Sequence, residues 1–208
     1  MRTASLCGVL LINFVIGCWY IVLLRKRKIS PALAMWVFFT IATVGSLMTY
    51  LAQGDFTLRD NILNAADILL VVTVSIGIFV YGDRSTRFSR FDLGCLIAVS
   101  GILIGWALTR QHVIAHSAIQ AILVIAYFPV IHRLWTTRRN TESYVMWFGL
   151  MLAPVFGLLS SRGILAAVYA IRAIASSGML LLLMARIDWK TARSAPKPQE
   201  PGASSLSL

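Results

Sequence analysis

The chain has 208 residues, of which 58% are hydrophobic and only 13% are charged, and its mean hydropathy is +0.78. A soluble domain has about 45–50% apolar and about 25% charged residues. The composition therefore excludes an ordinary soluble domain and predicts a membrane protein. The formal net charge of +11 raises the question of a nucleic-acid partner, which depends on where the basic residues lie.

Seven apolar stretches follow one another along the chain, each near the length of about 20 residues that a helix needs to cross a bilayer core of about 30 Å. They cover residues 4–24, 33–52, 62–81, 93–109, 114–134, 144–161 and 164–185. This pattern predicts an all-α integral membrane protein with seven transmembrane helices.

Most basic residues lie in connections that seven crossing helices would put on one side of the membrane. Of 19 Lys and Arg residues, 14 fall there, in four groups: Arg25–Lys28; Arg84, Arg87 and Arg90; Arg133, Arg138 and Arg139; Arg186, Lys190, Arg193 and Lys197. This asymmetry predicts a multi-pass protein of the cell membrane, with its N-terminus outside and its C-terminus in the cytoplasm. A nucleic-acid site would instead form a contiguous basic stripe on a folded domain. We therefore expect the lipid bilayer as a partner, and no nucleic acid.

Residues with catalytic or metal-binding chemistry are scarce and scattered. Cys7, Cys18 and Cys95 all fall inside apolar stretches, without the spacing of a disulfide framework or a metal motif. A membrane enzyme would need a nucleophile with a base, or a set of metal ligands, near the membrane interface. The carboxylates in the loops have no His or Cys residue at the sequence spacing of such a motif. The sequence thus predicts no enzyme activity, no cofactor and no metal site.

Two stretches of the chain share an order of features. In "YIVLLRKRKISPALAMWVFF" and, about 111 residues later, in "AYFPVIHRLWTTRRNTESYVMWFG", a basic turn is followed by a Met-Trp pair that opens the next helix. This predicts two parallel three-helix repeats, residues 1–92 and 113–190, joined by a connector helix at 93–112. Residues 191–208 are polar and rich in Pro and Ser, and predict a disordered cytoplasmic tail.

The chain resembles a known family. A plan of three, one and three helices with the N-terminus outside is that of the PQ-loop superfamily, which includes the SWEET sugar transporters. The stretch "PVIHRLWTTRRNTES" resembles the superfamily signature, a Pro-Gln pair followed by a basic loop with Ser or Thr. Pro129 matches the proline, and Val130 stands where the glutamine would be.

The resemblance implies a carrier that moves a small polar solute, sugar-like or anionic, by alternating access. It implies hinges at Pro129 and Pro154, while the first-half hinge positions hold Cys18 and Thr43. Proline kinks a helix in any case, so a static kink and a mechanical hinge both stay open. The missing glutamine and prolines favour an alternative, a non-transporting membrane sensor or partner-docking subunit on the same fold.

Ionisable and polar side chains inside the apolar stretches predict the solute site. Asn64 and Asp67 share a face of the stretch 62–81, and Tyr169, Arg172 and Ser176 share a face of the stretch 164–185. Charges at such depth are costly unless they are paired or hydrated, so they should face the bundle interior. We expect an ion pair between Asp67 and Arg172, serving as a static brace, as part of the solute site, or as both.

The resembled sugar transporters place one asparagine in the third helix and one in the seventh against the sugar. Asn64 or Asn61 matches the first, whereas the seventh apolar stretch has no asparagine, which argues against simple hexose specificity. Asn61 also fits a helix cap. Secondary candidates for lining the cavity are Asn13, Gln120, Trp147 and Ser160.

Gly101 and Gly105 are four residues apart in the connector. Small residues at this spacing let helices approach closely in a membrane. The spacing predicts packing against a neighbouring helix, and leaves contact between subunits of a homo-oligomer open.

Overall fold

The structure is a computed structural model that describes residues 2–29, 31, 33–54, 56–82, 90–138, 140 and 142–194. Over these residues the chain is helical and contains no strand, which confirms the all-α prediction. The elements are α1 (Arg2–Arg25), α2 (Leu33–Leu51), the short 3-10 helix η1 (Leu58–Asn61), α3 (Ile62–Tyr81), α4 (Arg90–Thr109), α5 (His112–Ile125), α6 (Phe128–Thr137), α7 (Tyr144–Ser160) and α8 (Ile164–Ser194).

Four segments of the described chain are long and apolar enough to cross a membrane: Arg2–Arg25, Leu58–Tyr81, His112–Thr136 and Ile164–Arg193. Shorter apolar helices cover Met35–Leu51, Leu93–Thr109 and Tyr144–Ser160. Large apolar side chains also cover the outside of the bundle; Phe14, Leu108 and Leu182, for example, are 70%, 80% and 75% exposed. An apolar surface of this extent suits hydrocarbon rather than water. The chain thus has the features of a membrane protein.

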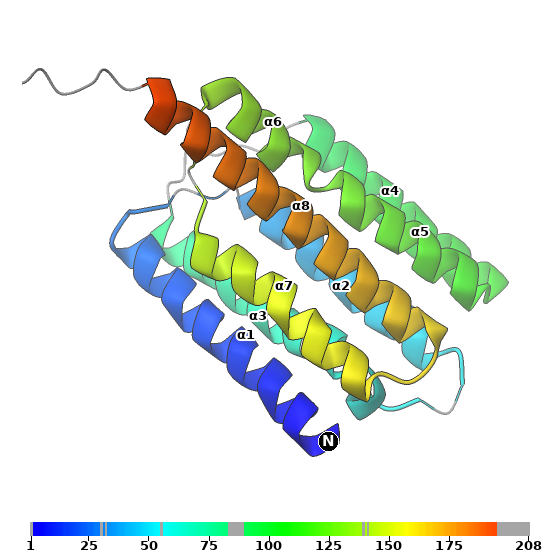
Figure 1. Cartoon of the computed structure of the whole chain (residues 1–208). Coiled ribbons are helices and arrows are strands. Elements are labelled where there is room, and N and C mark those ends of the chain that lie inside the picture. Colours follow the sequence, from blue (N-terminus) through cyan, green and yellow to red (C-terminus); the bar gives the residue numbers. More distant parts are fainter. Residues whose placement is uncertain are drawn as a thin grey trace, which may run out of the picture.

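The helices pack side by side as a bundle (Figure 1). Helix α3 packs against both α1 and α2, and α8 packs against α7, α5 and α6. These two sets meet where α1 contacts α7 and where α2 contacts α5. Helix α4 packs on α5 and α2 at one edge. The interior is therefore enclosed by helices from both ends of the sequence.

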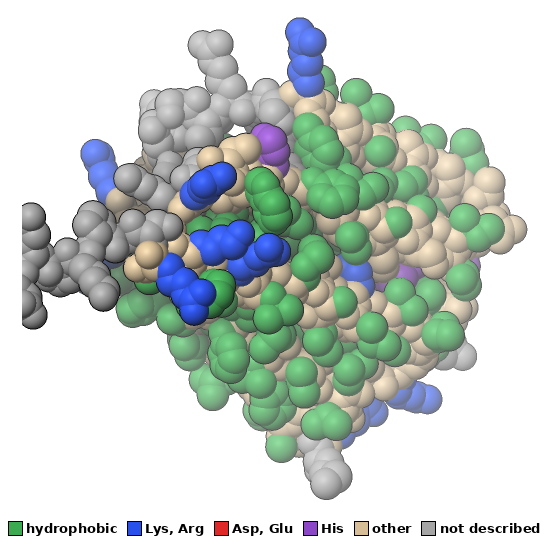
Figure 2. All heavy atoms as spheres, turned by 45° about the horizontal axis from the view of Figure 1, so that its top comes forward, with side chains coloured by type: hydrophobic (Ala, Val, Ile, Leu, Met, Phe, Trp, Pro, Cys, Tyr) green, Lys and Arg blue, Asp and Glu red, His purple; other side chains and the backbone are tan. Residues whose placement is uncertain are grey.

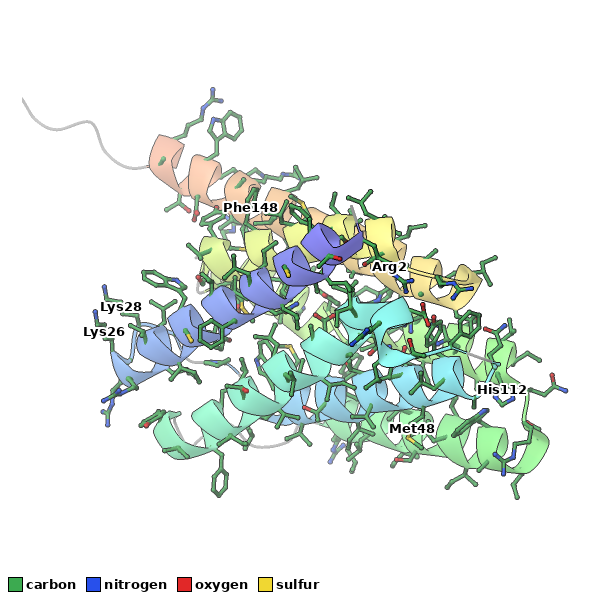
Figure 3. All side chains as sticks on the ribbon, turned by 90° about the horizontal axis from the view of Figure 1, so that it is seen from below. Arg2, Lys26, Lys28, Met48, His112 and Phe148 are labelled. Atoms are coloured by element: carbon green, nitrogen blue, oxygen red, sulfur yellow. The ribbon has the colours of Figure 1, made fainter. Side chains whose placement is uncertain are left out.

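The first helix defines the two ends of the bundle, which we call the Arg2 end and the Arg25 end. Figure 3 shows Arg2 at one end of α1 and Lys26 and Lys28 at the other. The basic residues at the end of α1, the start of α4, the end of α6 and the end of α8 fall toward the Arg25 end. Figure 2 shows Lys and Arg side chains gathered toward one end of a largely hydrophobic face. Arg84, Arg87, Arg139 and Lys197 lie outside the described residues.

The predicted fifth span is interrupted. Helix α5 ends at Ile125, residues 126 and 127 form a turn, and α6 begins at Phe128. The backbone N–H of Ala126 still donates to the Ile122 carbonyl at 2.9 Å. Pro129 thus falls in the first turn of α6, where a missing N–H costs no intrahelical hydrogen bond. The expected irregularity is present, as a break between two helices.

The last helix is longer than its predicted span. Helix α8 has 31 residues and, at about 1.5 Å per residue, exceeds a bilayer core of about 30 Å. Residues 191–194 are helical, so the prediction that the tail begins at residue 191 is wrong. The remainder of the predicted tail, 195–208, lies outside the described residues.

The glycines that bring helices together are not those that the spacing predicted. A Cβ placed on Gly101 or Gly105 would meet no heavy atom of the described residues within 4 Å. The prediction that they pack against a neighbouring helix of the chain is therefore wrong, and homo-oligomerisation stays a prediction. Close approach occurs instead at Gly149 of α7, where an added Cβ would overlap the side chain of Ile16 in α1.

Candidate functional site

A cavity lies inside the bundle and is lined by side chains from α2, α3, α5, α7 and α8 and from the turn after α5. It offers about 50 Å³ to the centres of water-sized molecules. One enclosed water needs about 10–15 Å³ of such space, and a drug-sized ligand occupies a pocket of about 300–1,000 Å³. The cavity in this conformation therefore has room for a few waters and is too small for a hexose.

Asp67 and Tyr169 meet at the cavity wall. The Tyr169 hydroxyl donates a hydrogen bond of 2.8 Å to Asp67 Oδ2, and both side chains are buried, at 2% exposure for Tyr169 and 9% for Asp67. Among the described residues, Asp67 Oδ1 has no hydrogen-bond partner. One oxygen of this buried carboxylate is therefore left without an identified donor.

Arg172 approaches the same cavity but does not pair directly with Asp67. Its Nε donates to Gln120 Oε1 at 3.1 Å, and its guanidinium carbon lies 4.8 Å from the centre of the Tyr169 ring. Among the described residues, no ion pair joins Arg172 to Asp67. The prediction of a direct ion pair is therefore wrong. Instead, the Tyr169 hydroxyl donates to one oxygen of Asp67, and the Gln120 amide oxygen accepts from Arg172.

A chain of hydrogen bonds continues from Gln120 toward the Arg2 end. Gln120 Nε2 donates to Ser46 Oγ at 2.9 Å. With its amide nitrogen toward the Thr43 carbonyl at 3.0 Å, Asn64 accepts from Ser46 Oγ at 3.0 Å. This orientation of the amide is favoured because, in the opposite one, the amide oxygen would face only hydrogen-bond acceptors and the amide nitrogen only donors. Donors therefore point in one direction, from Arg172 through Gln120 and Ser46 to Asn64.

His116 belongs to the same polar layer and was missed by the sequence analysis. Its ring is fully buried, and Nδ1 lies 3.2 Å both from Thr49 Oγ1 and from the Ser46 carbonyl. Gln120 Nε2 lies 3.4 Å from His116 Nε2. A signal existed, because His116 and Gln120 are four residues apart in an apolar stretch and therefore share a helix face. Thr43, Ser46 and Thr49, each three residues apart in α2, form the facing row.

The two Met-Trp pairs occupy comparable buried places. Trp36 and Trp147 are 4% and 3% exposed, and both line the cavity. Trp147 Nε1 donates to Glu142 at 3.2 Å. In the alignment of the two stretches Pro31 stands where Glu142 does, and Trp36 Nε1 has no partner among the described residues. The indole N–H of Trp36 is therefore a buried donor without an identified acceptor.

The other predicted site residues lie at varied distances from the cavity. Ser176 is buried on α8 but does not line it. Pro154 is buried inside α7, and its missing N–H frees the Leu150 carbonyl, which lies 3.4 Å from Ser177 Oγ of α8. The side chain of Pro129 lies outside the described part of the structure.

Asn61, the alternative to Asn64, and the secondary candidates Asn13 and Ser160 do not line the cavity. Asn61 caps α3, since its side chain accepts from Asn64 N at 3.4 Å, which confirms the capping interpretation. Asn13 is buried and donates to the Val9 carbonyl at 3.2 Å within α1. Ser160 joins α7 to α1 by a hydrogen bond of 3.1 Å from Ser5. Of these three hydrogen bonds, that of Ser160 joins two helices of the bundle, whereas those of Asn13 and Asn61 are local in the sequence.

Comparisons with protein families, curated proteins and solved structures give no match. Within the described residues, no group of three or more His, Cys, Asp and Glu side chains comes together as a metal site. The chemistry of the site therefore rests on its own side chains: a carboxylate, a guanidinium, a phenol, an indole N–H and an aromatic wall.

Proposed function

We propose that this chain is a membrane carrier of the SWEET and PQ-loop type, which moves a small polar solute across the cell membrane by alternating access. The observation that carries the proposal is the interior cavity at which Asp67, Tyr169 and Arg172 meet. Polar and charged groups buried in a membrane bundle are costly, and they commonly mark a solute or ion pathway.

The proposal includes the architecture of two parallel three-helix repeats joined by α4. The packing is consistent with it, because α3 contacts the other two helices of the first proposed repeat, as α8 does in the second. The matching burial of Trp36 and Trp147 at one cavity adds support. In this arrangement the site lies between the repeats, where rocking of one against the other would alternately open its two sides.

Each side chain has a distinct proposed role. Asp67 accepts a hydrogen bond from the solute with the oxygen that has no protein partner, and Trp36 donates one with its indole N–H. Arg172 attracts an anionic or electron-rich group, and Gln120 fixes its orientation. Tyr169 orients the carboxylate. Asn64 and Ser46 belong to the polar layer that closes the cavity toward the Arg2 end.

The small size of the cavity fits an occluded conformation of such a carrier. A solute larger than a few waters requires the bundle to open. The three cavity-lining rings Trp36, Phe39 and Tyr127 pack edge to face or tilted, with centroids 5.7 to 6.3 Å apart in consecutive pairs, and they would have to separate. The proposed hinge Pro129 follows Tyr127 by two residues, and the proposed hinge Pro154 lies on α7, whose Trp147 ring packs on Tyr127.

The test is thermal unfolding of the purified chain in detergent against a panel of sugars, amino acids, nucleosides and organic anions. A ligand at about 100 times its dissociation constant should stabilise the folded state by about 2.7 kcal/mol. We expect at least one solute class to stabilise the wild type, and we expect Asp67→Asn and Arg172→Gln each to abolish that stabilisation. The same solute should enter proteoliposomes that contain the wild type, and should not enter those with either variant.

Matched controls separate loss of the site from loss of charge. Asp188→Asn and Arg110→Gln make the same chemical changes at exposed positions and should keep both ligand stabilisation and uptake. Normal uptake by both site variants would remove Asp67 and Arg172 from the mechanism. A folded wild type that responds to no solute, and that co-purifies with another membrane protein, would favour the alternative of a sensor or partner-docking subunit.

A further inference from the structure

A second polar pocket lies at the Arg2 end of the bundle, away from the central cavity. It offers about 370 Å³ to the centres of water-sized molecules and draws its walls from the start of α1, from η1 and from the connection between α7 and α8. The polar residues of the wall include Arg2, Thr57, Arg59, Asp60 and Arg162. Its size falls in the range of small-ligand sites.

Asp60 is the acidic residue of this pocket, and it contacts two of the arginines in the pocket wall. Its side chain is only 4% exposed. Oδ2 accepts from the backbone N–H of Thr57 at 2.8 Å and from the Thr57 hydroxyl at 2.7 Å. Oδ1 accepts from Arg2 and lies 3.8 Å from Nη1 of Arg162. Both carboxylate oxygens are therefore engaged, and two guanidinium groups are held above them.

The pocket keeps a surplus of positive charge. Three arginines line it with one carboxylate, so its formal charge is +2 from 3 positive and 1 negative groups. A guanidinium has five N–H donors, and Asp60 can engage only a minority of those on Arg2 and Arg162. The side chains of these two arginines are 48% and 64% exposed. Most of their donors thus remain available to a molecule in the pocket.

The start of α1 adds to the positive potential. Helix α1 has 24 residues and no acidic residue in its first turn, and Thr3 of that turn lines the pocket. The first N–H groups of a helix have no intrahelical acceptor, and the helix dipole places partial positive charge there. An anion with several oxygens could accept from both the arginines and this helix end.

We propose that this pocket binds a phosphate group, through bidentate contacts with Arg59 and Arg162 and with the donors that Asp60 leaves free on Arg2. Guanidinium groups match the spacing of phosphate oxygens better than ammonium groups do. Because the pocket lies where the apolar helices end, the phosphate belongs either to a phospholipid head group or to a soluble anion. The site stands apart from the proposed transport activity, since none of its lining residues lines the central cavity.

The test uses the full-length chain in detergent, with inorganic phosphate as one probe and a diacyl phosphatidic acid as the other. Titration at constant ionic strength gives the phosphate affinity, and native mass spectrometry counts the bound lipid. A diacylglycerol with the same acyl chains controls for binding through the chains alone. The variants are Arg59→Gln and Arg162→Gln, both of which leave the contact between Arg2 and Asp60 in place. Arg110→Gln, an exposed arginine in the connection between α4 and α5, is the matched control.

We expect each pocket variant to weaken binding about tenfold or more, the usual loss for a hydrogen bond to a charged group, while Arg110→Gln matches the wild type. Binding of the phosphatidic acid without inorganic phosphate assigns the site to a lipid head group, and binding of inorganic phosphate assigns it to a soluble anion. The proposal is overturned if neither probe binds the wild type, if the diacylglycerol binds as well as the phosphatidic acid, or if all three variants bind alike.

Discussion

At the scale of single residues, the hydrogen bond between Tyr169 and Asp67 is the contact that most defines the central site. It joins α8 to α3 at 2.8 Å, and both side chains are buried. A buried acceptor that loses its donor costs about 1–3 kcal/mol, whereas an exposed one is rehydrated at little cost. The chain offers a natural comparison, because the Tyr144 hydroxyl donates to Asp188 at 2.6 Å on the exposed surface.

We predict that Tyr169→Phe lowers the free energy of unfolding by about 1–3 kcal/mol, and that Tyr144→Phe lowers it by less than about 1 kcal/mol. Thermal or denaturant unfolding in detergent would measure both. In an Asp67→Asn background, Tyr169→Phe should lower the free energy of unfolding by a smaller amount, because the carboxylate that accepts the hydrogen bond from the hydroxyl is then absent. Equal effects of the two Tyr→Phe variants would contradict the buried contact.

At the scale of helices, the close approach of α7 to α1 depends on a glycine. Gly149 is buried, and a Cβ added there would overlap the side chain of Ile16. A Cβ on Gly101 would meet no atom of the described part of the chain within 4 Å. Overpacking a well-packed contact costs about 1–3 kcal/mol. Replacing an exposed helical glycine by alanine gains up to about 1 kcal/mol of helix propensity.

We therefore predict opposite signs for one chemical change at two sites. Gly149→Ala should destabilise the chain, and Gly101→Ala should leave its stability unchanged or raise it by up to about 1 kcal/mol. The unfolding midpoints of the two purified variants, each compared with that of the wild type, would test this prediction. A stabilised Gly149→Ala would show that α1 and α7 are not in close contact. A destabilised Gly101→Ala would indicate that this face of α4 packs against another chain.

The break between α5 and α6 leads to a second prediction at the scale of helices. Pro129→Ala restores an N–H that could donate to the Ile125 carbonyl and join the two helices into one. We expect slower amide hydrogen exchange over residues 126–131 in this variant. If the break is a hinge of a carrier, we also expect a lower uptake rate at unchanged solute affinity. Unchanged exchange would mean that packing, rather than the proline, holds the helices apart.

At the scale of the whole molecule, the distribution of charge predicts the orientation in the membrane. Basic residues concentrate at the Arg25 end, and cytoplasmic connections are enriched in Lys and Arg. We predict that, in a background without Cys7, Cys18 and Cys95, Arg110→Cys reacts with a membrane-impermeant maleimide on intact cells. Lys28→Cys should react only after the cells are permeabilised. The reverse pattern would invert the proposed topology.

The sequence by itself determined the features that follow from local rules. Runs of apolar residues predict helices because a backbone in hydrocarbon must satisfy its own hydrogen bonds. The described chain is helical over most of each predicted stretch, and the turn at residues 126 and 127 interrupts the fifth. Asp67 and Arg172 were assigned to the interior because exposing a charge to lipid is costly, and both line the cavity. The helix cap at Asn61 could also be predicted from the sequence, because a cap depends on residues within one helical turn.

Only the tertiary structure decided which side chains meet. Helix periodicity fixes which residues share a face, but not how far one helix is rotated or shifted against the next. That freedom explains why Tyr169 reaches Asp67 while Arg172 reaches Gln120, and why Gly149 rather than Gly101 lies at a helix contact. It also explains the pocket around Asp60, whose arginines are 58 and 102 residues away along the chain. Rotation and shift are set by the summed packing of all the helices, which no single stretch of sequence contains.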